Sequence, residues 1–353
     1  MLKYDYEFYI ITRNTDLGSN EAYKEIRKNT LFENEGVFYY YFSEDQLNAL
    51  SVINKINSLS PDLIYLNSFW SYPFSINIVR AKKSGSLKAP ILLAPRGMLS
   101  TGALGLKSLK KNAFLTISKL FNWYKEIPFH ATNEEEKGDI LKQFPKAEIF
   151  MAPNVNSGTV YTLSKPKEKN HIKLFYLSRI ARVKNLHFAL EVLNLIPDTY
   201  QVEYDIYGNI EDAAYWKECK RIIEKLPANI KVKYRHELQF NEVQSIIVSY
   251  HCLFLPTLNE NFGHSIVESL LCGCPVIISD QTPWNDVFIG NSGQAIPLNN
   301  IQNFVDCIKH MASLNNEEYA IKSAAAIHYI SGKLNIAQSI AQYKTVFNES
   351  AKK

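Results

Sequence analysis

The chain alternates between short apolar segments and longer segments with helical patterning, and the alternation continues over most of its 353 residues. The apolar segments are three to six residues long. They are rich in β-branched and aromatic residues, which favours strands over helices. Strands that alternate with helices form βαβ units, whose strands lie parallel in one sheet. The sequence therefore predicts an α/β protein built from doubly wound parallel sheets.

The predicted strands form two series with a polar stretch, residues 154–170, between them. The strands expected from these patterns cover residues 8–12, 37–42, 63–66, 91–94, 129–131 and 149–152 in the first series, and 173–177, 202–207, 230–234, 252–255 and 275–279 in the second. A chain of 353 residues also agrees with two domains. We expect domains over 1–155 and 156–333, and a final helix within 334–353.

The composition excludes several classes of protein. With 46% hydrophobic and 21% charged residues, the chain is neither disordered nor fibrous, and it has no apolar run long enough to span a bilayer. The start of the chain lacks a signal-peptide pattern, and five cysteines do not indicate a disulfide scaffold. We therefore expect a cytoplasmic protein.

Several nucleotide-site motifs are absent from the sequence. It contains no Gly-x-Gly, no phosphate-binding loop of the Gly-x4-Gly-Lys type and no Asp-x-Asp. The cysteines and histidines show no zinc-ligand spacing. The expectation is a protein without a metal site and without a resident cofactor.

Two basic residues follow the predicted strand 173–177. Arg179 comes directly after its carboxyl end, and Lys184 lies where the next helix begins. Cations near a helix N-terminus suit a diphosphate, and each charge-assisted hydrogen bond contributes about 1.5–3 kcal/mol. Basic residues at helix starts are common, so this pair by itself is weak evidence for a site.

A second polar segment follows the predicted strand 252–255. Glu260 lies in a loop, Gly263 allows a close approach of the backbone to a ligand, and Glu268 lies about one turn into the next helix. Carboxylates in these positions can accept hydrogen bonds from the hydroxyl groups of a sugar or a ribose. The alternative for Glu268 is a favourable interaction with the helix dipole alone.

Taken together, these segments resemble the retaining glycosyltransferases of family 4, which have the GT-B fold of two facing Rossmann-like domains. The matching features are the Glu-x7-Glu spacing from Glu260 to Glu268 with the segment 270–277 after it, and the Ser-Arg-x4-Lys pattern that ends at Lys184. In the first half they are the segments 61–65, 94–99 and 129–132. The resemblance covers nearly the whole chain.

The resemblance implies a role for each residue of the second half. Arg179 and Lys184 would hold the diphosphate of a nucleotide-sugar donor and stabilise it as a leaving group, Glu260 would contact the donor sugar, and Glu268 would bind the ribose. It thus implies Arg179, Lys184 and Glu260 as the catalytic residues. Further donor contacts would come from the loop and helix start that contain Phe262, Gly263, His264 and Ser265. The family needs no metal, and its retention of configuration is expected to follow from attack on the face that the leaving group vacates.

The first domain would bind a glycan or lipid-linked acceptor, and the final helix would pack back onto it. Many relatives have a histidine near the acceptor; here Asn67 or Arg96, followed by Gly97, would occupy comparable positions. The chain also departs from the family, because residues 9–13 resemble its second strand and no Gly-Gly loop precedes them. Either residues 8–12 take the place of the central first strand, or the first domain lacks that strand and two strand edges are exposed.

Residues 80–125 contain ten basic residues and no acidic residue, which suits an anionic partner. Within this stretch, residues 106–125 place apolar side chains at helical spacing beside lysines. We hypothesise that this helix contacts an anionic membrane surface on the inner face of the cell membrane; a core-packing helix with solvated lysines is the alternative. No recognition module accompanies the basic stretch, so nucleic acid is not an expected partner.

The leading hypothesis is a metal-independent, retaining glycosyltransferase of hexosyltransferase type that acts in cell-surface polysaccharide biosynthesis, such as that of a capsule or O-antigen. One alternative is a non-catalytic nucleotide-sugar-binding partner of another transferase. The other is a nucleotide-sugar epimerase, which would need converging acid and base residues that this sequence does not show.

Overall fold

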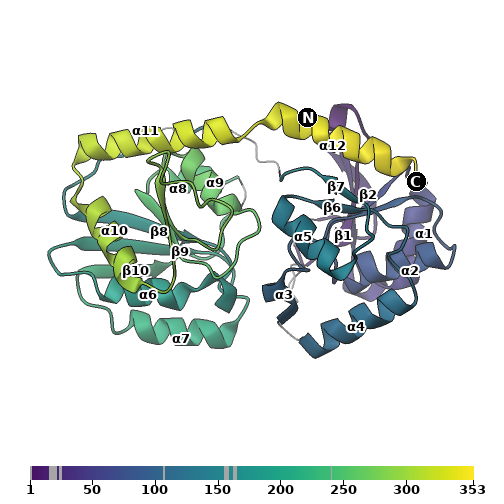
Figure 1. The fold of residues 1–353 in the computed structure, drawn as a ribbon, viewed down its shortest axis with the longest axis horizontal. Helices are drawn as coiled ribbons and strands as arrows, with labels where there is room; N and C mark the ends of the chain where they lie inside the picture. The colour runs from purple at the N-terminus through teal and green to yellow at the C-terminus, as the bar shows by residue number, and fades with distance from the viewer. Residues whose placement is uncertain are drawn as a thin grey trace. The chain divides into compact units, whose positions relative to one another are not determined.

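The computed structural model describes residues 2–15, 22–23, 26–105, 108–154, 159–161, 165–239 and 241–353. Leu106 and Lys107 of the expected membrane helix, and residues 155–158 and 162–164 of the expected linker, lie outside the described residues. The chain divides into two compact units (Figure 1): unit 1 comprises Met1–Val155 and Ala337–Lys353, and unit 2 comprises Asn156–Ile336.

Unit 2 contains one parallel sheet in the order β10-β9-β8-β11-β12-β13. Its strands are β8 (His171–Leu177), β9 (Gln201–Tyr207), β10 (Ile230–Tyr234), β11 (Cys252–Leu255), β12 (Val276–Ser279) and β13 (Gly293–Ile296). The first five confirm the strands expected in this half. The sequence did not predict β13, because this four-residue edge strand has the pattern Gly-Gln-Ala-Ile, with only its last residue buried.

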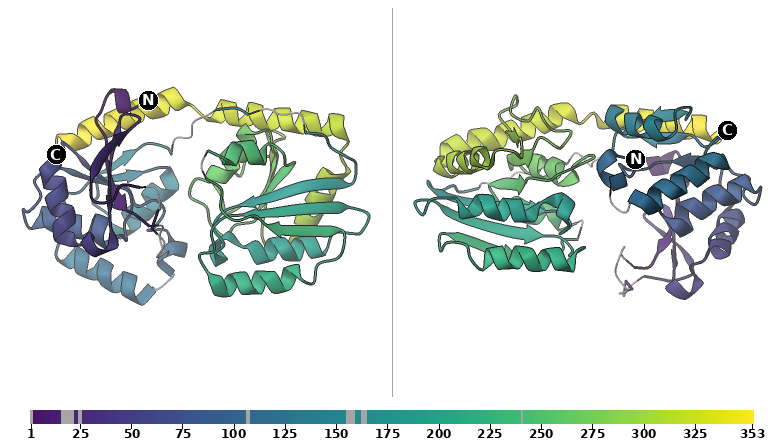
Figure 2. Two further views of the ribbon diagram at one scale, coloured as in Figure 1. Left: turned by 180° about the vertical axis from the view of Figure 1, so that it is seen from behind. Right: turned by 60° about the horizontal axis from the view of Figure 1, so that its bottom comes forward.

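Helices cover both faces of this sheet (Figures 1 and 2), which explains why its central strands are almost continuously apolar. On one face α6 (Leu186–Asn194) packs against α7 (Ala213–Ile223) and α10 (Ile301–Ser313). On the other, α9 (His264–Leu271) packs against α8 (Val243–Ile247) and α11 (Asn316–Lys333). The four residues of β11 are fully buried between these layers.

The strand order of unit 2 reverses between β8 and β11. From β8 the chain builds outward through β9 to β10, and it then returns to place β11 on the other side of β8. In a doubly wound sheet, the crevice at the carboxyl ends of the strands beside such a reversal is where ligands bind. The fold therefore predicts a ligand site at the loops that follow β8 and β11.

Unit 1 contains two sheets instead of the single doubly wound sheet that the sequence predicted. Three strands, β1 (Tyr9–Arg13), β3 (Val37–Phe42) and β2 (Leu31–Asn34), pair in that order. Four parallel strands, β4 (Ile64–Leu66), β5 (Ile91–Leu93), β6 (Phe129–Ala131) and β7 (Ile149–Met151), form the second sheet.

The unexpected strand of unit 1 is β2, which pairs antiparallel with β3. Two residues connect them, Glu35 with φ 52° and Gly36 with φ 79°. Positive φ at both positions is the geometry of a tight hairpin turn whose twist matches the flanking strands.

Strands β1 and β4 are both edge strands in the described part of the chain. There β1 pairs with β3 alone and β4 with β5 alone, so residues 8–12 do not occupy a central position beside β4. These are the two strand edges expected of a sheet without its first strand.

The helices of unit 1 are α1 (Ala49–Leu59), α2 (Asn77–Lys83), α3 (Thr101–Gly105), α4 (Ser108–Leu120), α5 (Glu134–Gln143) and α12 (Ile336–Ala351). The last of them packs on the four-stranded sheet, since Tyr343, Val346 and Phe347 form one buried cluster with Leu92 and Ala152. Among the described residues, no helix combines the length and the apolar character that a membrane span requires.

Candidate functional site

The two motifs of unit 2 meet at the strand reversal. Lys184 ends the short 3-10 helix η4 (Arg182–Lys184), which follows β8, and Glu260 lies in the loop after β11. The Lys184 Nζ atom is 2.6 Å from Glu260 Oε2 and 3.3 Å from the carbonyl oxygen of Asn259. The two charged side chains are only 10% and 17% exposed, so this ion pair is largely withdrawn from solvent.

Hydrogen bonds between the two loops fix this geometry. The Thr257 hydroxyl donates to the Val183 carbonyl oxygen at 3.0 Å, and the Leu258 N–H donates to the same oxygen at 2.8 Å. Asn185 Nδ2 donates to the Pro256 carbonyl oxygen at 2.9 Å. Because the backbone on both sides is held, Lys184 and Glu260 are positioned before any ligand arrives.

The ion pair retains capacity for a ligand. An ammonium group has three N–H donors, and Lys184 uses two of them on Glu260 and Asn259. Glu260 accepts the Asn261 backbone N–H through its other oxygen, Oε1, at 3.1 Å. The pair can therefore offer a donor to a phosphate oxygen and acceptor lone pairs to a hydroxyl group.

Gly263 begins α9 in the left-handed region, with φ 79°. A Cβ atom added at this position would lie 2.8 Å from Ile266 Cδ1 and 3.3 Å from Glu260 Cγ, so the turn is adapted to a residue without a side chain. The preceding residue, Phe262, accepts a hydrogen bond from the Trp284 indole through its carbonyl oxygen. Behind the turn, His264 is exposed and Ser265 is half-buried.

We expect Gly263→Ala to lower the free energy of unfolding by about 1–3 kcal/mol, because alanine would adopt a strained positive φ and contact Ile266. Urea denaturation would measure the change. Gly332→Ala in α11 is the matched control, since a Cβ there meets no atom within 4 Å. Equal stability of both variants would contradict the strained turn.

Glu268 faces a different environment from Glu260. It lies in α9 and is half-buried, and burial raises its pKa from 4.5 to about 7. Within the described part of the chain, nothing donates a hydrogen bond to this carboxyl group in compensation. A half-buried carboxyl group without a partner at the carboxyl edge of a doubly wound sheet is suited to bind hydroxyl groups of a ligand.

Arg179 pairs with a carboxylate other than Glu260. It forms an ion pair with Glu211, which follows β9, and the two side chains are 52% and 45% exposed. An exposed ion pair of this kind contributes about 0–1 kcal/mol, so a ligand can replace Glu211 at little cost. The structure thus brings Lys184 and Glu260 together but pairs Arg179 with a carboxylate that the sequence did not single out.

In unit 1, the loops at the carboxyl ends of β4, β5 and β7 converge on Arg96. Its Nε donates to Asn67 Oδ1 at 2.5 Å, its Nη2 donates to the Tyr65 hydroxyl at 2.8 Å, and its Nη1 donates to Asn154 Oδ1. Asn67 and Arg96 were both expected on the acceptor side, and they are in direct contact.

A carboxylate holds the backbone next to Arg96. Glu136, in the first turn of α5, accepts the Gly97 N–H at 2.6 Å through one oxygen. Its other oxygen accepts the Thr132 N–H at 2.9 Å and the Thr132 hydroxyl at 2.7 Å. Glu136 is 3% exposed, and these bonds satisfy it.

Behind Arg96 lies a buried relay of neutral groups. His130 Nε2 is 2.8 Å from the Ala152 carbonyl oxygen, which can only accept, so Nε2 carries the proton and Nδ1 accepts from Tyr65 at 2.6 Å. Burial lowers the pKa of His130 to about 4, and the ring is therefore neutral near pH 7. The relay orients the Tyr65 hydroxyl so that it accepts from Arg96.

The sequence did not single out four members of this network: Tyr65, His130, Glu136 and Asn154. A signal was available, because Tyr65 and His130 lie within predicted strands and Asn154 comes shortly after another. Because the carboxyl ends of adjacent parallel strands lie at one edge of a sheet, polar residues near those ends are expected to lie close together.

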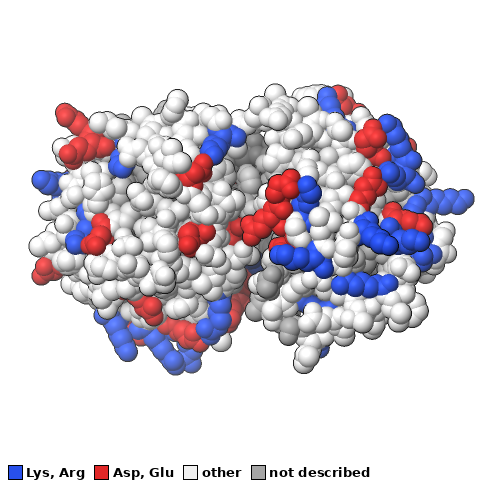
Figure 3. Space-filling model, viewed as in Figure 1, with Lys and Arg blue, Asp and Glu red and all other residues white. Residues whose placement is uncertain are grey.

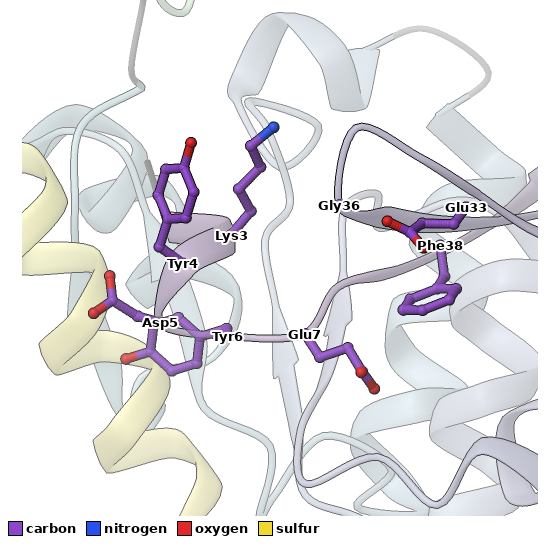
Figure 4. A pocket seen from close by; sticks show the side chains of 8 residues that line it. All are labelled: Lys3, Tyr4, Asp5, Tyr6, Glu7, Glu33, Gly36 and Phe38. Carbon is purple, nitrogen blue, oxygen red and sulfur yellow. The ribbon is translucent and has the colours of Figure 1, made fainter.

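The described residues also form a hollow of about 390 Å³ near the start of the chain (Figure 4). Its lining residues are Lys3, Tyr4, Asp5, Tyr6, Glu7, Glu33, Gly36 and Phe38. It lies at the amino ends of β1 and β3, the edge of the sheet opposite to that where doubly wound folds bind ligands. We assign it no ligand.

The described residues contain no group of three or more His, Cys, Asp or Glu side chains that could hold a metal ion.

Sequence comparison relates unit 2 to a known family. The profile of the family described as glycosyl transferases group 1 matches residues 162–328, the stretch that holds β8, Lys184, Glu260 and α9. Residues 162–328 are thus similar to the group 1 glycosyltransferases. Within this stretch, the Lys184–Glu260 pair lies at the strand reversal of the sheet.

Curated relatives of the chain include two bacterial transferases. The O-antigen chain mannosyltransferase RfbU of Salmonella typhimurium is 26% identical over 104 residues, which cover 30% of this chain and 28% of the relative. The poly(glycerol-phosphate) alpha-glucosyltransferase of Bacillus subtilis is 27% identical over 168 residues, which cover 46% of this chain and 23% of the relative. The matches thus span about a quarter of the length of each relative.

Solved structures show that the likeness extends over both units. HepE of Anabaena, in complex with UDP and glucose, has a TM-score of 0.68 at 15% identity and covers 88% of this chain and 86% of its own. Sucrose-phosphate synthase of Thermosynechococcus elongatus has a TM-score of 0.71 at 13% identity, with 97% and 88% covered. These likenesses show that the chain has the GT-B fold.

Proposed function

We propose that the chain is a glycosyltransferase that moves a hexosyl group from a nucleotide-sugar donor to a glycan or lipid-linked acceptor, with retention of configuration and without a metal ion. The observation that carries this proposal is the buried Lys184–Glu260 pair at the strand reversal of the unit that is similar to the group 1 glycosyltransferases. The relatives named as an O-antigen chain mannosyltransferase and a poly(glycerol-phosphate) alpha-glucosyltransferase support a role in cell-surface polysaccharide synthesis.

Unit 2 would bind the donor. The breaking of a sugar–phosphate bond places negative charge on the departing diphosphate, and a preorganised cation lowers the barrier for this step. Lys184 would supply that cation through its remaining N–H, and Arg179 would add a second cation after release from Glu211. Glu260 would contact the sugar and Glu268 the ribose, beside the backbone from Phe262 to Ser265.

Unit 1 would bind the acceptor at the edge that contains Asn67, Arg96 and Gly97. Turnover measurements with a panel of UDP-, GDP- and dTDP-sugars test the proposed function, and UDP-sugars come first because HepE was solved with UDP. Donor binding without hydrolysis or transfer, for every sugar of the panel and with lipid-linked and glycan acceptors supplied, would contradict catalysis and favour a non-catalytic partner.

We also propose that α4 contacts an anionic membrane surface. Three residues of the predicted apolar stripe face outward: Leu109 is 87% exposed, Leu120 75% and Ile117 47%. Tyr124, at the end of that stripe, is buried, as is Leu115 within the helix. Figure 3 shows the surface over α4 as white with blue patches, which agrees with the lysines and the lack of acidic residues in this stretch. An exposed apolar stripe among lysines fits lipid headgroups and upper acyl chains better than a core-packing role.

The double substitution Leu109→Asn and Leu120→Asn is expected to abolish flotation with vesicles that contain phosphatidylglycerol, because it removes the apolar anchor without changing charge. Leu50→Asn is the matched control, since Leu50 is also exposed, at 66%, but lies in α1. Binding should weaken as salt rises, since the lysines contribute through charge. Flotation that depends neither on anionic lipid nor on the α4 substitutions would exclude α4 as a membrane-binding surface.

A further inference from the structure

Arg96 carries a positive charge whose described partners are all neutral. They are the amide oxygens of Asn67 and Asn154 and the hydroxyl of Tyr65. A guanidinium stays charged at any pH at which proteins fold. The carboxylate of this network, Glu136, uses both its oxygens on Gly97 and Thr132, and in the described part of the chain Arg96 forms no ion pair. Its guanidinium is therefore oriented by neutral acceptors and not by an ion pair with a described carboxylate.

Arg96 and the two asparagines beside it also have N–H groups that their mutual hydrogen bonds do not use. Arg96 has five N–H groups and uses three of them, so two remain. Because Asn67 and Asn154 accept from Arg96 through Oδ1, each retains an amide Nδ2 with two N–H groups, for which the described residues provide no acceptor. A half-buried cation flanked by two amide donors suits a ligand with several acceptor oxygens.

Backbone strain at the same position shows that the direction of Arg96 is enforced. Arg96 has φ 55° and Gly97 has φ 74°, two successive left-handed residues. A non-glycine residue in this region costs of order 1 kcal/mol, and such strain persists where the surrounding structure holds it. Here Glu136 holds the Gly97 N–H while three acceptors hold the side chain.

We propose that this edge of the β4–β7 sheet is a phosphate-binding site centred on Arg96. The guanidinium fork fits both carboxylate and phosphate, but a phosphate has enough oxygens to accept from Arg96, Asn67 and Asn154 together. The phosphate comes either from a soluble phosphate compound or from a lipid-linked phosphate. Its assignment to the transfer acceptor rests on the proposed function; phosphate binding itself does not.

Calorimetric titration with inorganic phosphate and with pyrophosphate, at constant ionic strength, tests the site. A Lys184→Gln background weakens the phosphate site proposed in unit 2, so that the titration reports on unit 1. In this background, Arg96→Gln is expected to lower affinity about tenfold to a hundredfold, the loss of one charge-assisted interaction. Arg80→Gln, which removes an exposed arginine of the same acid-free stretch, should leave affinity unchanged.

Two further variants keep the test decisive if Arg96→Gln does not fold. Arg96→Lys retains the charge without the fork and should bind with intermediate affinity. Asn67→Asp keeps the shape of the side chain but places a carboxylate on the guanidinium, and it should abolish phosphate binding. Thermal unfolding of each variant shows whether it is folded.

A vesicle arm distinguishes the two sources of phosphate. Phosphatidylcholine vesicles with and without a polyprenyl phosphate are compared with the soluble probes. Binding that depends on Arg96 supports the site in either arm, and the arm that shows it identifies the source. Equal affinity of the Arg96→Gln and Arg80→Gln variants would overturn the proposal, and so would the absence of phosphate binding in both arms. Glucuronate serves as a carboxylate probe, and tighter binding of glucuronate than of phosphate would also overturn it. Donor turnover by the chain is a separate readout, so failure of the proposed function would not be confused with failure of this site.

Discussion

Replacing Lys184 with glutamine is expected to lower kcat for sugar transfer about a hundredfold to a thousandfold, the range found when a preorganised group that stabilises developing negative charge is removed. Its side chain is 10% exposed, and its ammonium is held in place by Glu260 and Asn259. Glutamine can still donate a hydrogen bond to Glu260, which limits the structural damage. Steady-state kinetics with a saturating donor would measure the change.

The control for this variant is Lys231→Gln, which removes an exposed lysine from β10 in the same unit. It should leave kcat unchanged. Thermal unfolding of both variants separates catalysis from stability, because the loss of one partner leaves Glu260 as a nearly buried charge without its counter-ion. A folded Lys184→Gln protein with a normal kcat would remove Lys184 from the proposed mechanism.

The second large effect is expected at Glu268, where stability and ligand binding should change in opposite directions. Glu268→Gln removes a carboxyl group whose ionised form is disfavoured by burial, so at pH 8 the free energy of unfolding should rise by about 1–3 kcal/mol. The same change removes the carboxylate that would accept the ribose hydroxyls. Nucleotide affinity should therefore fall about tenfold to a hundredfold.

The pH dependence follows from the direction of the pKa shift. The pKa of Glu268 rises from 4.5 to about 7 on folding, so between these values the folded state binds more protons than the unfolded state. Ionisation of Glu268 therefore lowers the free energy of unfolding of the wild-type protein, relative to that of Glu268→Gln, as pH rises from about 4.5 to 7. Above pH 7 the difference between the two proteins is constant. Nucleotide affinity should rise with pH through 7, as the carboxylate forms.

Urea denaturation across this pH range, with the glutamine variant as the reference, measures the stability difference. Calorimetry in buffers of different ionisation enthalpy measures the proton that ribose binding should release near pH 7. A stability difference that does not vary with pH would show that Glu268 titrates normally. An unchanged nucleotide affinity would place the ribose elsewhere.

Most of the elements could be predicted from local patterns. Every strand expected from short apolar runs is present, because a parallel sheet covered on both faces requires such runs. The strands that the sequence missed, β2 and β13, are edge strands, where half-burial weakens the apolar signal. In α4, the sequence identified the stripe of Leu109, Ile117 and Leu120, but only the structure showed that it faces outward.

The residues of the candidate site could also be predicted only in part from the sequence. Lys184 and Glu260 could be selected from the sequence because each follows an apolar strand in a motif with recognisable spacing. Their contact, 76 positions apart in the chain, depends on β8 and β11 being neighbours, which no local pattern specifies. Arg179 shows the opposite case, since its pairing with Glu211 depends on where the loop after β9 lies.

By itself, the amino-acid sequence determined the α/β class, the two series of strands, the basic stretch and the residue types of the donor motifs. These depend on periodicity, composition and short spacings, which act between residues close in the chain. Tertiary structure alone decided that unit 1 has two sheets and that Tyr65, His130, Glu136 and Asn154 form the network around Arg96. It also decided that Glu268 becomes half-buried without gaining a hydrogen-bond donor among the described residues. Burial and long-range pairing set these outcomes, because they depend on which strands become neighbours.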